Sequence, residues 1–448
     1  MIETQFATLP VRKVFFRLTI PSILSMVFSS IYMIADGIFV GRFIGAQALA
    51  AVNLVMPIMI IVLALPNMVA VGSSVKVSTA LGEGNIKKAR QLFSASVWLI
   101  IGTGAVFALL GAAFLRPLTE LVIKDPALAA PAYDYTRIFV YGMPFLMPLF
   151  AMDNFLRVCG RARYSMCVNV MVSLLNIVLD WLFLARLGLG IEFSAIATVI
   201  SMIIGSVFCF APFLGRKLTL RFTKPQISMQ EIRGILYNGS SEFFSGIAGS
   251  FISAIINGAL LALGGATAVA SYGIVMYIDT LLVNILYGIL DAIQPAVSYN
   301  LGAGKIKRTF SFFKISSIAT AAVSLVCMAL ILAFPDVLAG IFAKGDDREV
   351  ISMTVAALVL FSPSYLFTWY NMVTSAFLTA MDKPRESMLI MAFRAIIFPL
   401  ICLMLLPLFM GVYGVFFTAT LSGALAFTAA VIIWKRSVRH LNMAISSL

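Results

Sequence analysis

Long apolar stretches, separated by short polar segments, run through almost the whole chain. A hydrocarbon core about 30 Å thick is crossed by about 20 helical residues. Stretches of this length predict twelve membrane-spanning helices, at approximately 14–43, 48–75, 91–115, 131–158, 164–186, 191–214, 236–263, 267–299, 310–334, 350–379, 387–408 and 411–434. The first stretch is too long for a cleavable signal and lacks a clear small-residue cleavage site, so we expect it to be retained as a span.

Composition and charge support an all-α polytopic membrane protein. Of the 448 residues, 61% are hydrophobic and 11% are charged, against about 25% charged in a typical soluble protein. Most of the 32 lysines and arginines lie in alternate connecting segments and at both ends of the chain. The positive-inside rule therefore predicts a multi-pass protein of the inner (plasma) membrane with both termini in the cytoplasm.

The net charge of +13 follows from the same asymmetry. A nucleic-acid-binding protein would concentrate its basic residues in one patch or domain, whereas here they form small clusters in seven segments. We therefore expect no nucleic acid as a partner. The expected partners are the lipid bilayer and a small-molecule substrate, and we expect the protein to be a monomer.

The number and placement of the cysteines and the histidine argue against disulfide and metal sites. The five cysteines lie within or at the ends of apolar spans and show no CxxC spacing, so neither a disulfide framework nor a zinc site is indicated. The single histidine, His440, lies in the C-terminal tail. Ion chemistry inside the membrane must then use carboxylates and neutral oxygens, and we expect no cofactor apart from a coupling ion.

An internal repeat with an offset of about 221 residues divides the chain into halves. "LGEGNIKK" at 81–88 returns as "LGAGKIKR" at 301–308, and "GIEFSAIATVIS" at 190–201 returns as "GVYGVFFTATLS" at 411–422. Because each repeat holds six spans, both halves enter the membrane from the same side and are related by a pseudo-two-fold axis along the membrane normal. The predicted organisation is an N-terminal six-helix lobe (1–215), a cytoplasmic linker (216–235) and a C-terminal six-helix lobe (236–448).

The two "LGxG" loops could be compared with phosphate-binding glycine loops. Neither lies between a strand and a helix, as that mechanism requires. A tight cytoplasmic turn followed by a basic segment is the better interpretation.

Several motifs together resemble one transporter family. The opening "IPSILSMVFSSIYMIADGIFVGRFIGAQALAAVNLVMPI", the "LGEGNIKKA" loop, "NIVLDWLFL" at 176–184 and the two six-span halves are similar to the multidrug and toxic compound extrusion (MATE) transporters, in the bacterial and archaeal branches with an acidic pair in the N-terminal lobe. The resemblance implies a cation-coupled antiporter that binds amphipathic, often cationic, organic molecules between two lobes. It exports them by alternating access.

Two carboxylates and two neutral side chains are expected at one depth of the N-terminal lobe. Asp36, Asp180 and Thr198 each lie six or seven residues from the outer end of a predicted span, which is about 10 Å at 1.5 Å per residue. Asn176 precedes Asp180 by one helical turn and shares its face. These hard oxygen ligands suit Na⁺, or a proton held on a carboxylate. The matching positions in the resembled family are those implicated in cation binding.

This set is absent from the second half of the repeat. Asn257 stands opposite Asp36, and Cys402, Phe398 and Ala419 stand approximately opposite Asp180, Asn176 and Thr198. A structural role common to both halves would have been kept in both. The alternative is that these side chains only form hydrogen bonds between helices, as buried Asn and Thr often do.

Other charges within the spans have competing interpretations. Asp153 and Arg157 are spaced i, i+4, which favours a local ion pair. Asp291 and Arg394 are expected at equal depth, which suggests that they pair within the C-terminal lobe. Glu242, near the start of span seven, could join that pair or face cytoplasmic water.

Asp279 is expected near the midplane of span eight and has no acidic counterpart at the repeat position Met59. It could offer a counter-charge to a cationic substrate or accept a structural hydrogen bond. A second branch of the resembled family uses acidic residues in spans seven and ten for its cation site. Span ten here has no acidic residue within it, so a C-terminal sodium site of that kind is not expected.

Three functional classes follow. The first is an antiporter, coupled to H⁺ or Na⁺, that exports amphipathic or cationic organic compounds. The alternative within the same superfamily is a flippase for a lipid-linked saccharide or another lipid, which would favour a basic rather than an acidic interior. An enzyme or a channel is disfavoured because no nucleophile with a base, metal-ligand cluster or selectivity sequence is visible, and we expect the protein not to be an enzyme.

Overall fold

The computed structural model describes residues 5–123, 125–215, 218–342 and 348–446. These residues form helices and turns, with no strand among them. Within this part of the chain, eleven helical stretches are long and apolar enough to cross a membrane. The longest, α9 (Met229–Gly302), covers two predicted spans. Gly265 separates them, because it breaks the helical backbone at φ 65°. The predicted twelve-span, all-α membrane fold is confirmed.

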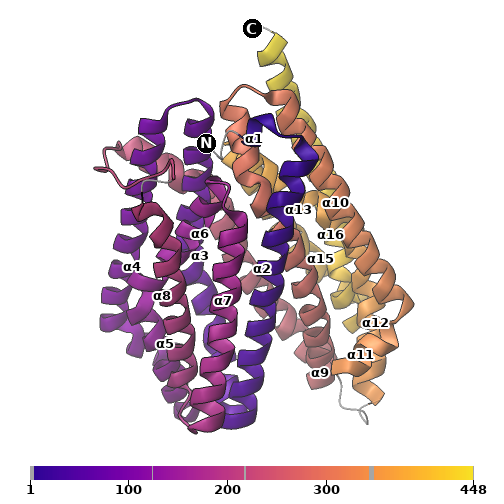
Figure 1. Ribbon diagram of the computed structural model, residues 1–448. Coiled ribbons are helices and arrows are strands. Elements are labelled where there is room, and N and C mark those ends of the chain that lie inside the picture. Colours follow the sequence, from indigo (N-terminus) through magenta and orange to yellow (C-terminus); the bar gives the residue numbers. More distant parts are fainter. Residues whose placement is uncertain (1–4, 124, 216–217, 343–347, 447–448) are drawn as a thin grey trace. The chain divides into compact units, whose positions relative to one another are not determined.

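The first six predicted spans correspond to the helices of the N-terminal half (Figure 1). A break in the fourth span has a simple cause, since proline lacks the N–H that a continuous helix needs and Pro148 stands at the break. In chain order the elements are α1 (Gln5–Thr8), α2 (Val11–Phe39) with the π-helical turn η1 (Val40–Ile44), α3 (Ala46–Gly82), α4 (Ile86–Val122), α5 (Pro126–Leu146), α6 (Pro148–Val158), α7 (Ala162–Asp180) with the π-helical turn η2 (Trp181–Arg186), and α8 (Glu192–Leu214).

The C-terminal half begins with α9 and interrupts two of its spans. A short 3₁₀ turn containing Pro363 divides the tenth span, and a π-helical turn divides the eleventh. After α9 the elements are α10 (Ile306–Ala333), α11 (Pro335–Phe342), α12 (Arg348–Phe361), η3 (Ser362–Ser364), α13 (Tyr365–Ala380), α14 (Pro384–Ala392), η4 (Phe393–Ile397), α15 (Phe398–Met410) and α16 (Val412–Ser446). His440 lies in α16, and its side chain is outside the described part of the structure.

By packing, the chain forms two compact units. Unit 1 comprises residues 1–243 together with 295–309, and unit 2 comprises 244–294 together with 310–448. Unit 1 thus takes in the end of α9 and the loop that follows it. The lobe boundaries drawn from the repeat, at 215 and 236, stay a prediction.

The two loops of the repeat adopt the same turn. Gly84 and Gly304 lie at φ 78° and 68°, in the left-handed region that glycine enters without steric cost. Each loop joins a helix that ends two residues earlier to one that begins two residues later. The predicted tight turn is therefore confirmed in both halves.

The predicted linker is packed against unit 1 in its described part; residues 216–217 lie outside it. Arg90 on α4 donates from Nε to the carbonyl of Thr219 at 2.8 Å, and Ser94 accepts a hydrogen bond from the Thr223 N–H at 2.8 Å. The ring of Phe222 lies 5.0 Å from that of the fully buried Phe93. Helix α9 then begins at Met229, so the last part of the predicted linker is helical.

Exposed apolar side chains cover helix surfaces in both units. Phe114 on α4 is 63% exposed and Phe409 on α15 is 84% exposed. Large apolar side chains in such numbers outside the core suit a lipid surrounding, in which they are not in contact with water.

Candidate cation site

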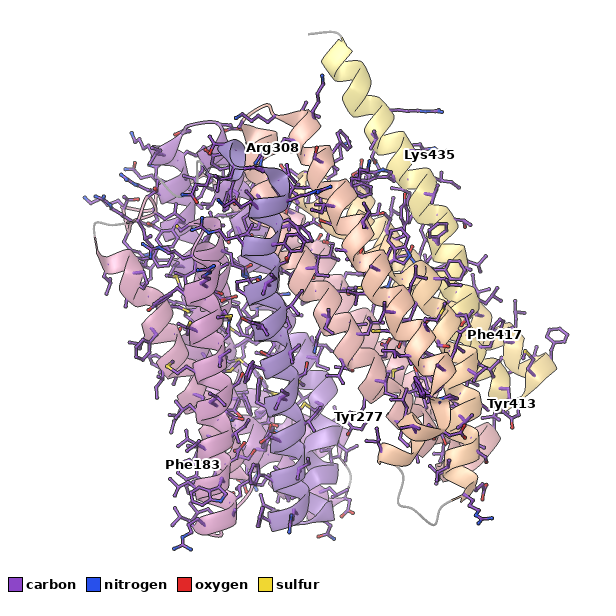
Figure 2. The ribbon with its side chains drawn as sticks, turned by 45° about the vertical axis from the view of Figure 1, so that its right-hand side comes forward. Phe183, Tyr277, Arg308, Tyr413, Phe417 and Lys435 are labelled. Atoms are coloured by element: carbon purple, nitrogen blue, oxygen red, sulfur yellow. The ribbon has the colours of Figure 1, made fainter. Side chains whose placement is uncertain are left out.

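The predicted carboxylates lie on two packed helices of unit 1. Asp36 is in the last turn of α2, and Asp180 is the last residue of α7, which packs against α2. Both helices continue directly into π-helical turns, η1 and η2, and these two turns contact each other. A π-helical turn re-aims the side chains beside it and is frequent at functional sites. Phe183 of η2 and Arg308 lie at opposite ends of unit 1 (Figure 2), so the acidic pair lies toward the end away from Arg308.

The two carboxyl groups contact each other. Asp36 and Asp180 are within hydrogen-bonding distance of one another through their side chains. Ser194, in the first turn of α8, donates from Oγ to Asp36 Oδ1 at 2.6 Å. Two acids can share a direct hydrogen bond only when one of them carries a proton.

Asn176 connects the pair to α8. Its amide lies between the Asp180 carboxylate on one side and Thr198 on the other, so Nδ2 is assigned to the carboxylate and Oδ1 to the donors. In this orientation Nδ2 donates to Asp180 Oδ2 at 3.2 Å. Oδ1 accepts from the Thr198 hydroxyl at 3.0 Å and from the Thr198 N–H at 3.3 Å.

The site is deeply buried on one side. Asp180 and Asn176 are 0% and 1% exposed, Thr198 is 9% exposed and Asp36 is half-buried. Tyr135 on α5 is also buried and lies within electrostatic reach of both carboxyl groups. Oδ1 of Asp180 receives no hydrogen bond from a protein donor. A buried carboxylate oxygen without a donor is costly, and a bound cation or proton would satisfy it.

The donor set fits a monovalent cation or a proton. It offers two carboxylates, the Asn176 amide oxygen and the Thr198 hydroxyl, all hard oxygen ligands. In the described part of the chain no three or more His, Cys, Asp or Glu side chains come together as a metal site would require. The geometry can therefore hold H⁺ or Na⁺ between helices α2, α7 and α8.

All four side chains predicted as one set come together in the structure: Asp36, Asn176, Asp180 and Thr198. Their role in binding a cation stays a prediction. The sequence reasoning missed Ser194 and Tyr135. Ser194 precedes Thr198 by one turn on the same face of α8 and could have been found from that spacing. No pattern distinguishes Tyr135 from the other tyrosines.

The local ion pair between Asp153 and Arg157 is confirmed. Both side chains are buried on α6, and Arg157 Nη2 contacts Asp153 Oδ2. Asp153 Oδ1 also accepts hydrogen bonds from the Ser165 hydroxyl and, at 2.8 Å, from Asn169 Nδ2, both on α7. The pair thus fixes α6 against α7.

The other predicted charges lie on α9 and η4. Asp279 and Arg394 line one cavity in unit 2, and they are close enough to interact electrostatically. The predicted pairing of Asp291 with Arg394, the placement of Glu242 and a substrate role for Asp279 stay predictions.

Comparison with known proteins adds independent findings. The sequence model of the MatE family matches residues 21–182 and 243–405. The chain is 24% identical over 434 residues to the "Multidrug export protein MepA" of Staphylococcus aureus (strain MSSA476), covering 96% of this chain and 94% of that protein. Two solved structures share its fold at 22% identity. The first is a MATE protein in complex with MaL6, with a TM-score of 0.94 and coverage of 98% of this chain and 99% of that chain. The second is an outward-facing multidrug resistance MATE family transporter, with a TM-score of 0.93 and coverage of 98% of each chain.

Proposed function

Because the chain belongs to the MatE family of transporters, we propose that it is a cation-coupled antiporter that exports amphipathic or cationic organic compounds by alternating access. Membership of this family makes it a multi-pass membrane transporter and not an enzyme. The proposal further places it in the plasma membrane as a monomer with both termini in the cytoplasm. Its coupling ion binds at Asp36 and Asp180.

The single observation that carries the proposal is the contact between two acidic side chains in unit 1. Asp180 is 0% exposed and is in hydrogen-bonding contact with Asp36. Two carboxylates in contact, one of them fully buried, repel each other unless a cation or proton lies between them. The direct carboxyl contact supports H⁺ as the coupling ion, since two acids in hydrogen-bonding contact need one shared proton.

Ion binding here can be coupled to helix packing. Release of the proton would leave two charges facing each other between α2 and α7, which pack along their length. A ligand shifts a conformational equilibrium only by the difference between its affinities for the two states. Repulsion in the empty site would favour a state in which α2 and α7 are separated near Asp36, and protonation would favour the packed state.

The substrate class rests on the relatives. The staphylococcal protein is named as a multidrug export protein, which supports small organic compounds as substrates. This name favours drug export over the transport of a lipid-linked saccharide.

We would test the function in proteoliposomes loaded with ethidium, with the membrane potential clamped by potassium and valinomycin. Efflux is followed by fluorescence under an imposed pH gradient or an imposed Na⁺ gradient. The variants are Asp36→Asn and Asp180→Asn. Glu120→Gln is the matched control, because its carboxylate is exposed and, among the described residues, is paired with Arg116 on the same helix.

We expect the pH gradient to drive efflux in the wild type and the control, and both Asp variants to lose at least tenfold in rate. Efflux driven by the Na⁺ gradient and not by the pH gradient would identify Na⁺, rather than H⁺, as the coupling ion. If neither gradient drove efflux by correctly inserted protein, the antiport proposal would be rejected. Full activity of Asp36→Asn would show that the acidic pair is not needed for coupling.

A further inference from the structure

A second polar site lies inside unit 2, apart from the acidic pair of unit 1. It is a cavity of about 290 Å³ lined by α9, the end of α12, η3, α13, η4, α15 and α16. Its wall combines apolar and aromatic side chains with two opposite charges, and it includes Asp279, Arg394, Asn371, Tyr272, Phe361 and Phe416. A concave, largely apolar site with a few converging polar groups is the usual form of a small-molecule site.

The two charges face the cavity without forming a direct ion pair. Asp279 and Arg394 interact electrostatically, yet no nitrogen–oxygen contact within 4.0 Å joins these two described residues. Tyr365, which is 1% exposed, is hydrogen bonded to Asp279. Asp279 is therefore held by Tyr365 on one side while its charge remains separated from the guanidinium.

Arg394 owes its position to an irregular helix. It lies in the π-helical turn η4, and Pro399 follows one turn later without an N–H to donate. The cavity wall includes both Pro399 and the preceding Ala395.

Asn371 supplies an unpartnered acceptor. Its side chain is 1% exposed, and Nδ2 donates to the carbonyl of Gly423 at 3.3 Å. Oδ1 receives no hydrogen bond from the protein, although the residue lines the cavity. A buried acceptor left without a donor is costly, and a ligand that carries an N–H group would relieve that cost.

The two charges make this cavity unfavourable for ligands with a single charge. An organic cation attracted by Asp279 would be repelled by Arg394. An organic anion attracted by Arg394 would be repelled by Asp279. In a site of low dielectric constant both effects are strong. A molecule with one charge of each sign satisfies both groups, and its apolar part would lie against Tyr272, Phe361 and Phe416.

We propose that this cavity of unit 2 binds a small zwitterionic organic molecule, whose ammonium group contacts Asp279 and Asn371 and whose carboxylate contacts Arg394. The inference rests on the proposed function and adds to it a second substrate class, zwitterionic compounds, with a binding place in this cavity, beside the cationic compounds named there. The repeat gives the N-terminal half no counterpart of the acid, since Met59 stands opposite Asp279. The site therefore belongs to unit 2 alone.

The test uses the purified full-length protein in lipid nanodiscs at pH 7, with no ion gradient. Three probes share one aromatic group: L-phenylalanine is zwitterionic, 2-phenylethylamine is a cation and 3-phenylpropanoate is an anion. Binding is measured by titration calorimetry for the wild type, Asp279→Asn and Arg394→Gln. Asp336→Asn is the matched control, because this acid of unit 2 is exposed at the start of α11.

We expect L-phenylalanine to bind the wild type and the control at least tenfold more tightly than either single-charge probe. Each variant should lose at least tenfold in affinity for L-phenylalanine and change its preference in its own way. Asp279→Asn should bind the anion as well as the zwitterion, and Arg394→Gln should bind the cation as well as the zwitterion.

Equal wild-type affinities for the cation and the zwitterion would overturn the proposal, and so would the absence of binding by all three probes. The wild-type comparison stands even if a variant fails to fold. Because equilibrium binding needs no gradient, its failure with ethidium efflux intact would reject this site and leave the antiporter standing. Binding of L-phenylalanine without gradient-driven ethidium efflux would support this site and reject the antiporter proposal.

Discussion

At the scale of single residues, the acidic site is held together by hydrogen bonds that run from Asp180 through Asn176 to Thr198. Asn176 contacts both Asp180 and Thr198, whereas Thr198 contacts the carboxylates only through Asn176. Removing a partner from a buried polar group costs about 1–3 kcal/mol, because the remaining group is left unsatisfied. The geometry therefore predicts that the two neutral residues are not equally important.

We expect Asn176→Leu to lower pH-driven ethidium efflux at least tenfold, because Asp180 loses its amide donor. Thr198→Val should lower it about two- to fivefold, since Asn176 keeps its contact with Asp180. The measurement is the initial efflux rate per inserted protein. Ser173→Ala is the control, because that buried hydroxyl bonds only to the Asn169 carbonyl of its own helix at 3.0 Å. Equal losses in Ser173→Ala and Asn176→Leu would attribute the effect to packing of α7 and contradict the site.

At the scale of elements, α3 and the end of α9 cross so closely that only glycine fits. A Cβ atom on Gly82 would lie 2.1 Å from the Tyr299 carbonyl oxygen, and one on Gly302 would lie 2.2 Å from that of Thr79. The glycines occupy matching positions of the repeat, and so do Thr79 and Tyr299. The repeat thus packs against itself through one contact used twice within unit 1.

Gly82→Ala and Gly302→Ala should each destabilise the protein, because the added methyl group must push backbone atoms apart. Overpacking of this kind costs about 1–3 kcal/mol, which we expect to lower the melting temperature in detergent by several degrees. Gly102→Ala, in α4, is the matched control, since a Cβ there meets no atom within 4 Å. An unchanged melting temperature in both variants would contradict this prediction, because it would show that α3 and α9 can move apart to fit the methyl group without loss of stability.

At the scale of the whole molecule, the N-terminal residues are fastened to a distant part of the chain. The Phe6 carbonyl accepts from Asn300 Nδ2 at 3.0 Å and from Arg308 Nε at 2.9 Å, and Lys305 Nζ donates to the Ala7 carbonyl at 3.0 Å. The Phe6 ring packs edge-on against Tyr299 at 5.9 Å. Residues 295–309 join unit 1 although the chain on either side belongs to unit 2, and these contacts help to hold them there.

A double-mutant cycle tests this attachment. Phe6→Ala removes the ring that packs on Tyr299, and Arg308→Met removes the guanidinium that bonds to the residue 6 carbonyl. Each should lower the melting temperature, and the double variant should lose less than the sum of the two, since either change already loosens the attachment that the other contact stabilises. Lys314→Met is the control, because this lysine is exposed further along α10. Strict additivity would show that Phe6 and Arg308 stabilise the protein independently.

The linker illustrates why sequence patterns were insufficient for part of the fold. Polar composition predicts a connecting segment at 216–235, but Phe222 joins an aromatic cluster with Phe93, and Ser228 caps α9 through its contact with Glu231. The capping pair is readable from the sequence as Ser-x-x-Glu. The aromatic contact is not, because it depends on where α4 passes.

The sequence by itself determined the spans, the two halves and the grouping of the acidic residues near matching helix ends, because lipid requires long apolar helices and because one helical turn spaces side chains predictably. Only the tertiary structure decided which helices meet. It joined Ser194 to Asp36 over 158 positions, and it placed Arg394 in one cavity with Asp279. Depth along a helix is fixed by counting residues, but the neighbour at that depth depends on helix rotation and on π-helical turns, which long-range packing sets.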